Sequence, residues 1–158
     1  MLILVSGPSG VGKSTIINEL LKRHENLKVM TTYTTREARE MVDGAYYHVS
    51  KEEFEKMIKE NKLFEYENVH ADIFYGTPFA SLEKVTEGEF DYIKDMDVHG
   101  TKKIKEYLNG KARVVSIFLD SPDNKLRQRL QGRGESAEMI EKRLSRVEME
   151  RSHKKNYD

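Results

Sequence analysis

The clearest chemical signal in the sequence is a glycine-rich segment near its start. Residues 7–14 read GPSGVGKS, which matches the phosphate-loop pattern G-x-x-x-x-G-K-[ST]. Glycines at these positions let backbone N–H groups turn inward and surround a polyphosphate at the positive end of a helix. Lys13 adds a positive charge for the β- and γ-phosphates, and the Ser14 hydroxyl can ligate Mg²⁺. The segment predicts binding of a nucleoside triphosphate by Gly7, Pro8, Ser9, Gly10, Val11, Gly12, Lys13, Ser14 and Thr15.

The residues on either side place this segment between a strand and a helix. The apolar run at 2–5 predicts a short buried strand, and apolar residues with helical spacing follow at Ile16, Ile17, Leu20 and Leu21. A glycine-rich turn without function would not need a strand, a Lys-Ser pair and a helix in this order. The context therefore favours a working phosphate loop.

Strand and helix patterns alternate along the rest of the chain, which is typical of parallel strands joined by crossover helices. We expect core strands near 2–6, 28–32, 90–96 and 112–119. We expect helices near 13–24, 51–60, 78–87, 99–108, 122–132 and 137–154, and short strands near 45–49, 63–69 and 72–76. The predicted fold class is α/β, a P-loop NTPase core with a parallel sheet and an insertion at about 33–77.

Composition excludes several functional classes. The chain has 158 residues, enough for one domain with a hydrophobic core, and its 27 basic and 27 acidic residues give a net charge of zero. This balance argues against binding nucleic acid through bulk charge. The absence of cysteine excludes disulfides and thiolate zinc sites. The N-terminal apolar run is too short for a signal peptide, and no apolar run reaches the length of a membrane span, so we expect a cytoplasmic protein.

The segment at 33–77 differs from the rest because it is rich in tyrosine, threonine and charged residues. Arg36 and Arg39 are three residues apart beyond a strand, and two arginines so placed can bind one phosphate. Tyrosine hydroxyls nearby, such as that of Tyr47, can complete the cage. Taken alone, these residues fit a basic loop with surface ion pairs equally well.

Two carboxylates, Asp95 and Asp97, lie two residues apart at the end of an expected strand and therefore point to the same side. Asp95 would face a Mg²⁺ ion, whereas Asp97 could cap the following helix. Residues 97–100 also match the D-x-x-G of GTPase switch regions, but no N-K-x-D segment that recognises guanine follows. The sequence therefore argues against a GTPase.

Further segments fit one family pattern in order, over nearly the whole chain. They are Thr34-Thr35-Arg36, Arg39, Gly44 with Tyr47, Phe64-Glu65, Tyr75-Gly76-Thr77, Asp95-Met96-Asp97-Val98-His99-Gly100, Arg129-Leu130, Arg133-Gly134 and Ile140-Glu141-Lys142-Arg143-Leu144. Together with the phosphate loop, these segments closely resemble the guanylate kinases, which transfer a phosphoryl group from ATP to GMP. The resemblance implies an Mg²⁺-dependent enzyme that is a monomer or homodimer.

The resemblance also implies which residues contact GMP. Guanine presents the donors N1–H and N2–H₂ beside the O6 acceptor, so a carboxylate such as that of Glu65 can accept from both donors. The Thr77 hydroxyl can donate to O6, and Asp97 can accept the second N2 proton. The residues implied for GMP are Thr32, Arg36, Arg39, Tyr47, Glu65, Tyr75, Gly76, Thr77 and Asp97, of which Thr32, Arg36, Arg39, Tyr47 and Tyr75 form the phosphate cage.

Arginines in the last third of the chain complete the expected site. By resemblance, Arg133 and Arg143 belong to a lid that closes over the phosphates, and Arg129 lies near the adenine of ATP. The alternative, solvated arginines balanced by glutamates, suits Arg127 and Arg146 better. The resemblance implies catalytic roles for Lys13, Arg36, Arg133 and Arg143, and Mg²⁺ ligands at Ser14 and Asp95.

The sequence departs from the family pattern at several positions. The spacing from Arg39 to Gly44 is one residue shorter than usual, that from Glu65 to Tyr75 is one longer, and the lid is one shorter. Lys94 stands where the family usually has an apolar residue, and the C-terminal strand and helix of the family are expected to be absent after Asp158. We expect a single domain over 1–158, with a core at 1–32 and 78–158, a GMP-binding region at 33–77 and a lid at about 132–143.

Two other functions remain open at this point. The same scaffold could phosphorylate another small phosphorylated acceptor, such as a sugar phosphate, although Glu65 and Thr77 would then have no use. A non-catalytic binding module related to the family is the second alternative, although such a module would not need an intact Lys13-Ser14 pair.

Overall fold

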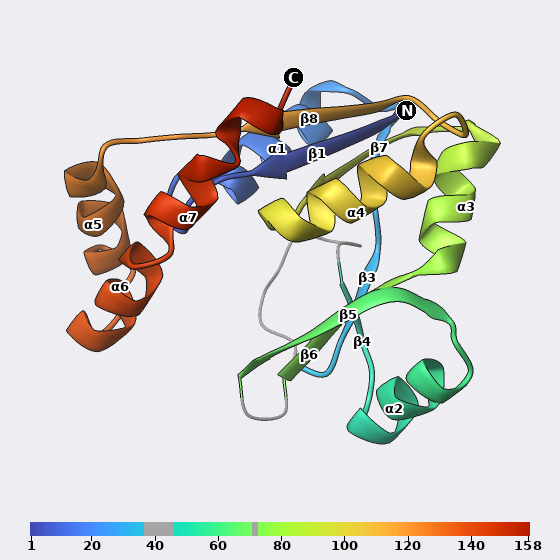
Figure 1. Cartoon of the computed structure of the whole chain (residues 1–158), viewed down its shortest axis with the longest axis horizontal. Coiled ribbons are helices and arrows are strands. Elements are labelled where there is room, and N and C mark those ends of the chain that lie inside the picture. The colour runs from blue at the N-terminus through green and yellow to red at the C-terminus, as the bar shows by residue number, and fades with distance from the viewer. Residues whose placement is uncertain (37–45, 71–72) are drawn as a thin grey trace.

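Two four-stranded sheets form the framework of the molecule (Figure 1). The computed structural model describes residues 1–36, 46–70 and 73–158. The larger sheet has the order β2-β7-β1-β8, and the smaller sheet, which lies below it in Figure 1, has the order β4-β3-β6-β5. The α/β core and the separate insertion that the sequence predicts are therefore both present.

The larger sheet is entirely parallel. β1 (Leu2–Ser6) lies between β7 (Asp91–Asp95) and β8 (Val114–Phe118), and β2 (Leu27–Val29) pairs with the other side of β7. The carboxyl ends of parallel strands meet at one edge, which is where α/β proteins place their ligands. The phosphate loop and the Asp95–Asp97 segment follow directly from two neighbouring strands at this edge.

Helices cover both faces of the larger sheet. Leu2 and Leu4 pack in one core cluster with side chains of α3 and α4, whereas Val5 packs on the opposite face with Ile17 of α1. This alternation follows from the two-residue period of a strand. The helices are α1 (Lys13–Arg23), α2 (Lys51–Lys59), α3 (Phe79–Glu87), α4 (Val98–Leu108), α5 (Asp123–Gln131), α6 (Ala137–Leu144) and α7 (Val147–Ser152), followed by a short 3₁₀ helix, η1 (Lys154–Asn156).

The smaller sheet packs against α2. Its strands are β3 (Thr32–Thr34), β4 (Tyr46–His48), β5 (Leu63–His70) and β6 (Ile73–Pro78). β6 pairs antiparallel with both β3 and β5, and β4 pairs in parallel with β3. Phe54 of α2 is fully buried and packs on Phe74 of β6, with ring centroids 5.5 Å apart.

Two predicted elements are wrong in their boundaries. The expected strand at 28–32 is divided, because β2 ends at Val29 in the larger sheet and β3 begins at Thr32 in the smaller one. A run of β-forming residues does not show which sheet each residue joins, because strand pairing is long-range. Met30 and Thr31 therefore connect the two sheets.

The expected helix at 137–154 is also divided, into α6 and α7. The Ser145 hydroxyl donates to the carbonyl of Lys142 at 2.9 Å, and the N–H of Arg146 donates to the carbonyl of Arg143 at 3.3 Å. A serine that competes for helix carbonyls and a tighter turn interrupt the α-helical pattern. The chain changes direction there, so α7 runs from α6 back toward β8 (Figure 1).

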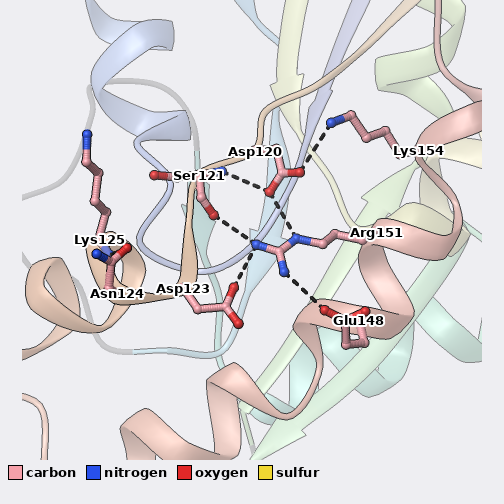
Figure 2. Close-up of polar contacts among 8 residues, drawn as sticks. All are labelled: Asp120, Ser121, Asp123, Asn124, Lys125, Glu148, Arg151 and Lys154. Carbon is pink, nitrogen blue, oxygen red and sulfur yellow. Dashed lines mark hydrogen bonds and ion pairs between the residues drawn. The ribbon is translucent and has the colours of Figure 1, made fainter.

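An ion-pair network attaches α7 to the loop after β8 (Figure 2). Arg151 contacts Asp120 at 3.1 Å, Asp123 at 2.7 Å and Glu148 at 3.1 Å, and it donates to the carbonyl of Ser121 at 2.9 Å. One guanidinium thus links two segments about thirty residues apart in the sequence. The network fixes the start of α5 relative to α7, and these helices border the phosphate loop.

We predict that Gly76→Ala destabilises the fold through its packing. A Cβ at this position would lie 2.9 Å from Leu63 Cδ1 and from Phe54 Cζ, and Phe54 is fully buried. Overpacking of this kind typically lowers the free energy of unfolding by about 1–3 kcal/mol, which denaturant unfolding would measure. Gly132→Ala is the matched control, because the nearest atom to its Cβ would be the carbonyl oxygen of Gln128 at 3.5 Å, at a φ of −62°. Equal stability of the two variants would contradict this tight contact.

Candidate active site

A cavity of about 390 Å³ lies where the carboxyl ends of β1 and β7 face the smaller sheet. The phosphate loop contributes Gly7, Ser9 and Lys13, and the end of β7 contributes Lys94 and Asp95. The smaller sheet contributes Thr32, Tyr46, Glu65, Glu67, Tyr75, Gly76 and Thr77. Residues that are distant in the sequence thus surround one space.

The phosphate loop has the backbone shape that its glycines permit. Gly7 has φ +137°, and a Cβ there would lie 2.1 Å from the carbonyl oxygen of Leu119, so only glycine fits. Lys13 Nζ donates to the carbonyls of Gly7 at 2.6 Å and Pro8 at 3.2 Å. Burial lowers the pKa of Lys13, and the charge of Asp95 partly opposes this shift. The lysine is held inside the loop, beside the space that a phosphate would fill.

The first turn of α1 is open to an anion. Gly12 precedes the helix with φ +109°, no side chain caps the helix, and its first turn contains no acidic residue. Free N–H groups at a helix start favour negative charge. Ser14 and Thr15 are exposed on this turn.

Glu65 and Thr77 form a cross-strand pair on the smaller sheet. They lie directly opposite each other on β5 and β6, and the Thr77 hydroxyl donates to Glu65 Oε1 at 3.0 Å. Burial raises the pKa of Glu65, while the bond from Thr77 and the charge of Lys94 oppose the shift. The sequence predicted that both residues face one ligand, and the structure brings them together in the cavity.

The structure does not place Tyr47 in the cavity. Its side chain is 59 % exposed and stacks on Tyr33 at 5.5 Å, whereas Tyr46 lines the cavity and contacts Tyr75 at 5.9 Å. Successive side chains of a strand point to opposite faces, so only one of the two tyrosines can face the ligand. The structure therefore places Tyr46, and not the predicted Tyr47, on the side of β4 that faces the cavity.

Asp95 and Asp97 both line the cavity, but they have different roles. Asp97 Oδ1 accepts from the N–H groups of His99 at 2.8 Å and Gly100 at 3.0 Å, so it caps α4. Asp95, the last residue of β7, lines the same cavity as Lys13, and its charge raises the pKa of Lys13 against the larger effect of burial. No cluster of three or more acidic or histidine side chains suited to a metal occurs among the described residues.

Arg143 and Arg133 lie on different sides of the phosphate loop. Arg143 lines the main cavity, pairs with Glu135 at 2.6 Å and donates to Ser9 Oγ at 2.8 Å. Arg133 is exposed and lines a second cavity of about 590 Å³ beside Gly12.

Arg129 joins Arg133 in the second cavity and also contacts the phosphate loop. Its guanidinium donates to the carbonyl of Val11 at 2.8 Å and to that of Gly10 at 3.4 Å. Through these bonds, Arg129 holds the backbone of the phosphate loop from the side of the second cavity. Gly10, Gly12 and Thr15 line the same cavity.

Of the two remaining predicted phosphate ligands, only Arg36 is among the described residues. Arg36 follows β3, where its N–H donates to Thr34 Oγ1 at 3.2 Å and its charge lowers the pKa of Tyr46 against the larger effect of burial. Arg39 lies outside the described residues, and its expected contact with phosphate stays a prediction.

Sequence reasoning missed two cavity residues from the region of α7, Arg146 and Glu150. Arg146 was expected to be a solvated surface charge, as Arg127 is in its ion pair with Glu141. Burial raises the pKa of Glu150, with Lys13 opposing the shift. The break between α6 and α7 turns these residues toward the site, and a continuous helix would not have suggested this.

A sequence model of the family described as Guanylate kinase matches residues 1–158. The chain belongs to the guanylate kinase family. It is 41% identical over 162 residues to a guanylate kinase of Clostridioides difficile, in an alignment that covers 100% of this chain and 77% of the relative. A guanylate kinase of Porphyromonas gingivalis is 41% identical over 154 residues, with coverage of 94% and 81%.

The fold agrees with a solved guanylate kinase. The crystal structure of guanylate kinase from Anaplasma phagocytophilum matches with a TM-score of 0.69 and 30% sequence identity, over 100% of this chain and 73% of that one. Because the chain belongs to the guanylate kinase family, its activity is the ATP-dependent phosphorylation of GMP. The comparisons favour neither a different acceptor nor a non-catalytic module. Among the helices that the structure describes, none combines the length and the apolar character needed to span a bilayer.

We predict that Glu65→Gln raises the melting temperature of the ligand-free protein at about pH 8. Because burial raises the folded-state pKa of Glu65 above its ordinary value of 4.5, ionisation of Glu65 destabilises the fold. This loss begins as the pH rises above the unfolded-state pKa and is complete above the folded-state pKa. The gain in the variant should therefore vanish at about pH 4.

Thermal melts across this pH range measure the effect. Glu67→Gln is the matched control, because Glu67 lies two residues along the same strand and its side chain is exposed. A pH-independent difference between Glu65→Gln and the wild type would contradict the burial of an ionised carboxylate.

Proposed function

We propose that the phosphoryl transfer takes place in the cavity between the two sheets, with ATP at the phosphate loop and GMP on the smaller sheet. The observation that carries this proposal is that the Glu65–Thr77 pair and Lys13 line one cavity. A base-recognition pair and a phosphate-binding lysine in the same space suit two nucleotides whose phosphates meet.

The guanine base binds against β5 and β6. Glu65 accepts from N1–H and N2–H₂, and adenine, which lacks a proton on N1, cannot make this pair. The Thr77 hydroxyl, which bonds to Glu65 in the free protein, rotates to donate to O6. Asp97 supplies a second acceptor for N2, since one of its oxygens is used for capping α4 and the other is not. Gly76 supports this site because its lack of a side chain lets β6 pack closely against Leu63 and Phe54.

The GMP phosphate binds where β3, β4 and β6 meet. Thr32 and Tyr46 are paired across β3 and β4, and Tyr75 contacts Tyr46 from β6. We assign the tyrosine role of the cage to Tyr46 in place of Tyr47. Arg36 and Arg39 supply the positive charge, as the resemblance implies.

ATP binds along the loop formed by residues 7–14 and the start of α1. The backbone N–H groups and Lys13 hold the β- and γ-phosphates, and Thr15 lies at the first turn. The second cavity, between Gly12 and Arg133, accommodates the adenosine, with Arg129 as its wall.

Magnesium would be held by the Ser14 hydroxyl and, through water, by Asp95. The donors are all oxygen, and Mg²⁺ uses few protein ligands when substrate phosphates complete its shell. When bound, the ion neutralises phosphate charge.

Catalysis rests on position and charge. The attacking oxygen belongs to an anionic phosphate, so no strong base is needed. Lys13, Arg36, Arg133 and Arg143 stabilise the charge that spreads over the transferred group. Residues 132–143 act as a lid, and the bond from Arg143 to Ser9 attaches it to the phosphate loop. We further propose that the enzyme works in the cytoplasm as a monomer or homodimer, without nucleic-acid or membrane partners.

We predict strong selectivity for guanine. The kcat/KM for GMP should exceed that for AMP by on the order of 10³-fold or more, because AMP leaves Glu65 without a donor in a buried site. A coupled ADP-release assay across GMP, AMP, CMP, UMP and a sugar phosphate measures this. Equal rates with AMP, or activity only on the sugar phosphate, would contradict the proposal.

We predict that Lys13→Ala lowers kcat by roughly 10²-fold or more, because a preorganised cation at the transferred phosphate is lost. Lys22→Ala is the matched control, since Lys22 is exposed near the other end of α1. Initial rates at saturating ATP and GMP measure the effect. Turnover at the wild-type rate in Lys13→Ala would show that the loop has no catalytic role.

A further inference from the structure

Lys94 is a buried cation that lines the cavity between the two sheets. Its side chain is 6 % exposed and reaches the cavity from β7. Its Nζ donates a hydrogen bond to Thr32 Oγ1, a neutral partner. Among the described residues, no carboxylate forms an ion pair with it. Burying an ammonium group in this way is costly unless an anion offsets its charge.

Three carboxylates influence Lys94 through their charge, but none of them forms an ion pair with it among the described residues. Burial lowers the pKa of Lys94, and the charges of Asp95, Glu65 and Asp97 oppose this shift in decreasing order. Two of them have other hydrogen-bonding partners, because Glu65 accepts from Thr77 and Asp97 caps α4, and the charge of Asp95 also acts on Lys13. None of them substitutes for a direct anionic partner, so the cavity holds a cation ready for one.

The bond between Lys94 and Thr32 also determines what Thr32 can do. Because the ammonium can only donate, Thr32 Oγ1 is the acceptor, and its own hydrogen is left to donate elsewhere. Thr32 lines the same cavity and is paired with Tyr46 across β3 and β4. The ammonium has further N–H groups beyond the one that Thr32 accepts. Two neighbouring groups thus present donors, one charged, on the β3 side of the cavity.

We propose that Lys94, which stands where the family usually has an apolar residue, binds the 5′-phosphate of GMP as its buried counterion, beside the hydroxyl of Thr32. This inference rests on the proposed function, because it requires GMP in this cavity. The phosphate is favoured over the base because Lys94 bonds to β3, beside Tyr46, whereas Glu65 and Thr77 already bond to each other on β5 and β6. A phosphate oxygen accepts from the ammonium and from the Thr32 hydroxyl at once.

The test compares GMP with guanosine, which lacks only the phosphate. Calorimetry measures the Kd of GMP directly and that of guanosine by displacement of GMP, for the wild type, Lys94→Met and Thr32→Val. Lys94→Met should weaken GMP binding by on the order of 10-fold or more and leave guanosine binding unchanged, because a charged hydrogen bond to the phosphate is lost. The factor by which the KM for GMP rises in Lys94→Met should exceed the factor by which kcat falls. Thr32→Val should shift the Kd in the same direction by less, and the double variant should lose less than the sum.

Lys102→Met is the matched control, since it removes one positive charge from the exposed surface of α4. A loss of equal size for GMP and guanosine would overturn the proposal, because Lys94 would then act through Glu65 and the base. Unchanged GMP binding in both Lys94→Met and Thr32→Val would also overturn it. Failure of the wild type to bind GMP would instead contradict the proposed function itself, which separates the two claims.

Discussion

The register of β1 against β7 is the constraint on which the whole site depends. Val5 lies opposite Asp95, the N–H of Met96 donates to the carbonyl of Val5 at 3.0 Å, and the Ser6 hydroxyl donates to the carbonyl of Met96 at 2.7 Å. These bonds hold the start of the phosphate loop against the acidic end of β7. A shift by one residue would turn Asp95 to the opposite face of the sheet, away from Lys13.

The cavity that results carries groups whose ionised forms are disfavoured in the free protein. Burial lowers the pKa values of Lys13 and Lys94 and raises those of Glu65 and Glu150. Each shift means that the charged form is less stable in the fold than in water. In the proposed complex the nucleotides would supply the missing partners, since phosphates offset the charge of lysines and the donors of guanine satisfy a carboxylate. Without ligand, these buried ionisable groups therefore lower the stability of the fold, and the same groups enable the site to bind two charged substrates.

The sequence predicted the parts of this arrangement that depend on local pattern. The phosphate loop and the helices near 13–24, 51–60, 78–87, 99–108 and 122–132 agree with the structure to within about two residues. The division of 28–32 between two sheets was less accessible, because it depends on long-range pairing. The sequence also did not show that Tyr46, and not Tyr47, lies on the cavity side of β4, or that a local turn at Ser145 brings Arg146 to the cavity. Lys94 stood out in the sequence as an unusual residue, but its contact with Thr32 could not be foreseen, because the two lie 62 residues apart.

The phosphates of the two nucleotides are proposed to meet, facing each other, in the cavity between the two sheets. A crystal structure with adenosine and guanosine joined through a polyphosphate bridge tests this most directly. We expect guanine to be hydrogen-bonded to Glu65 and Thr77, with the bridge passing over Lys13 to Thr32. Guanine bound anywhere else on the molecule, or a bridge that does not reach Lys13, would contradict the shared cavity.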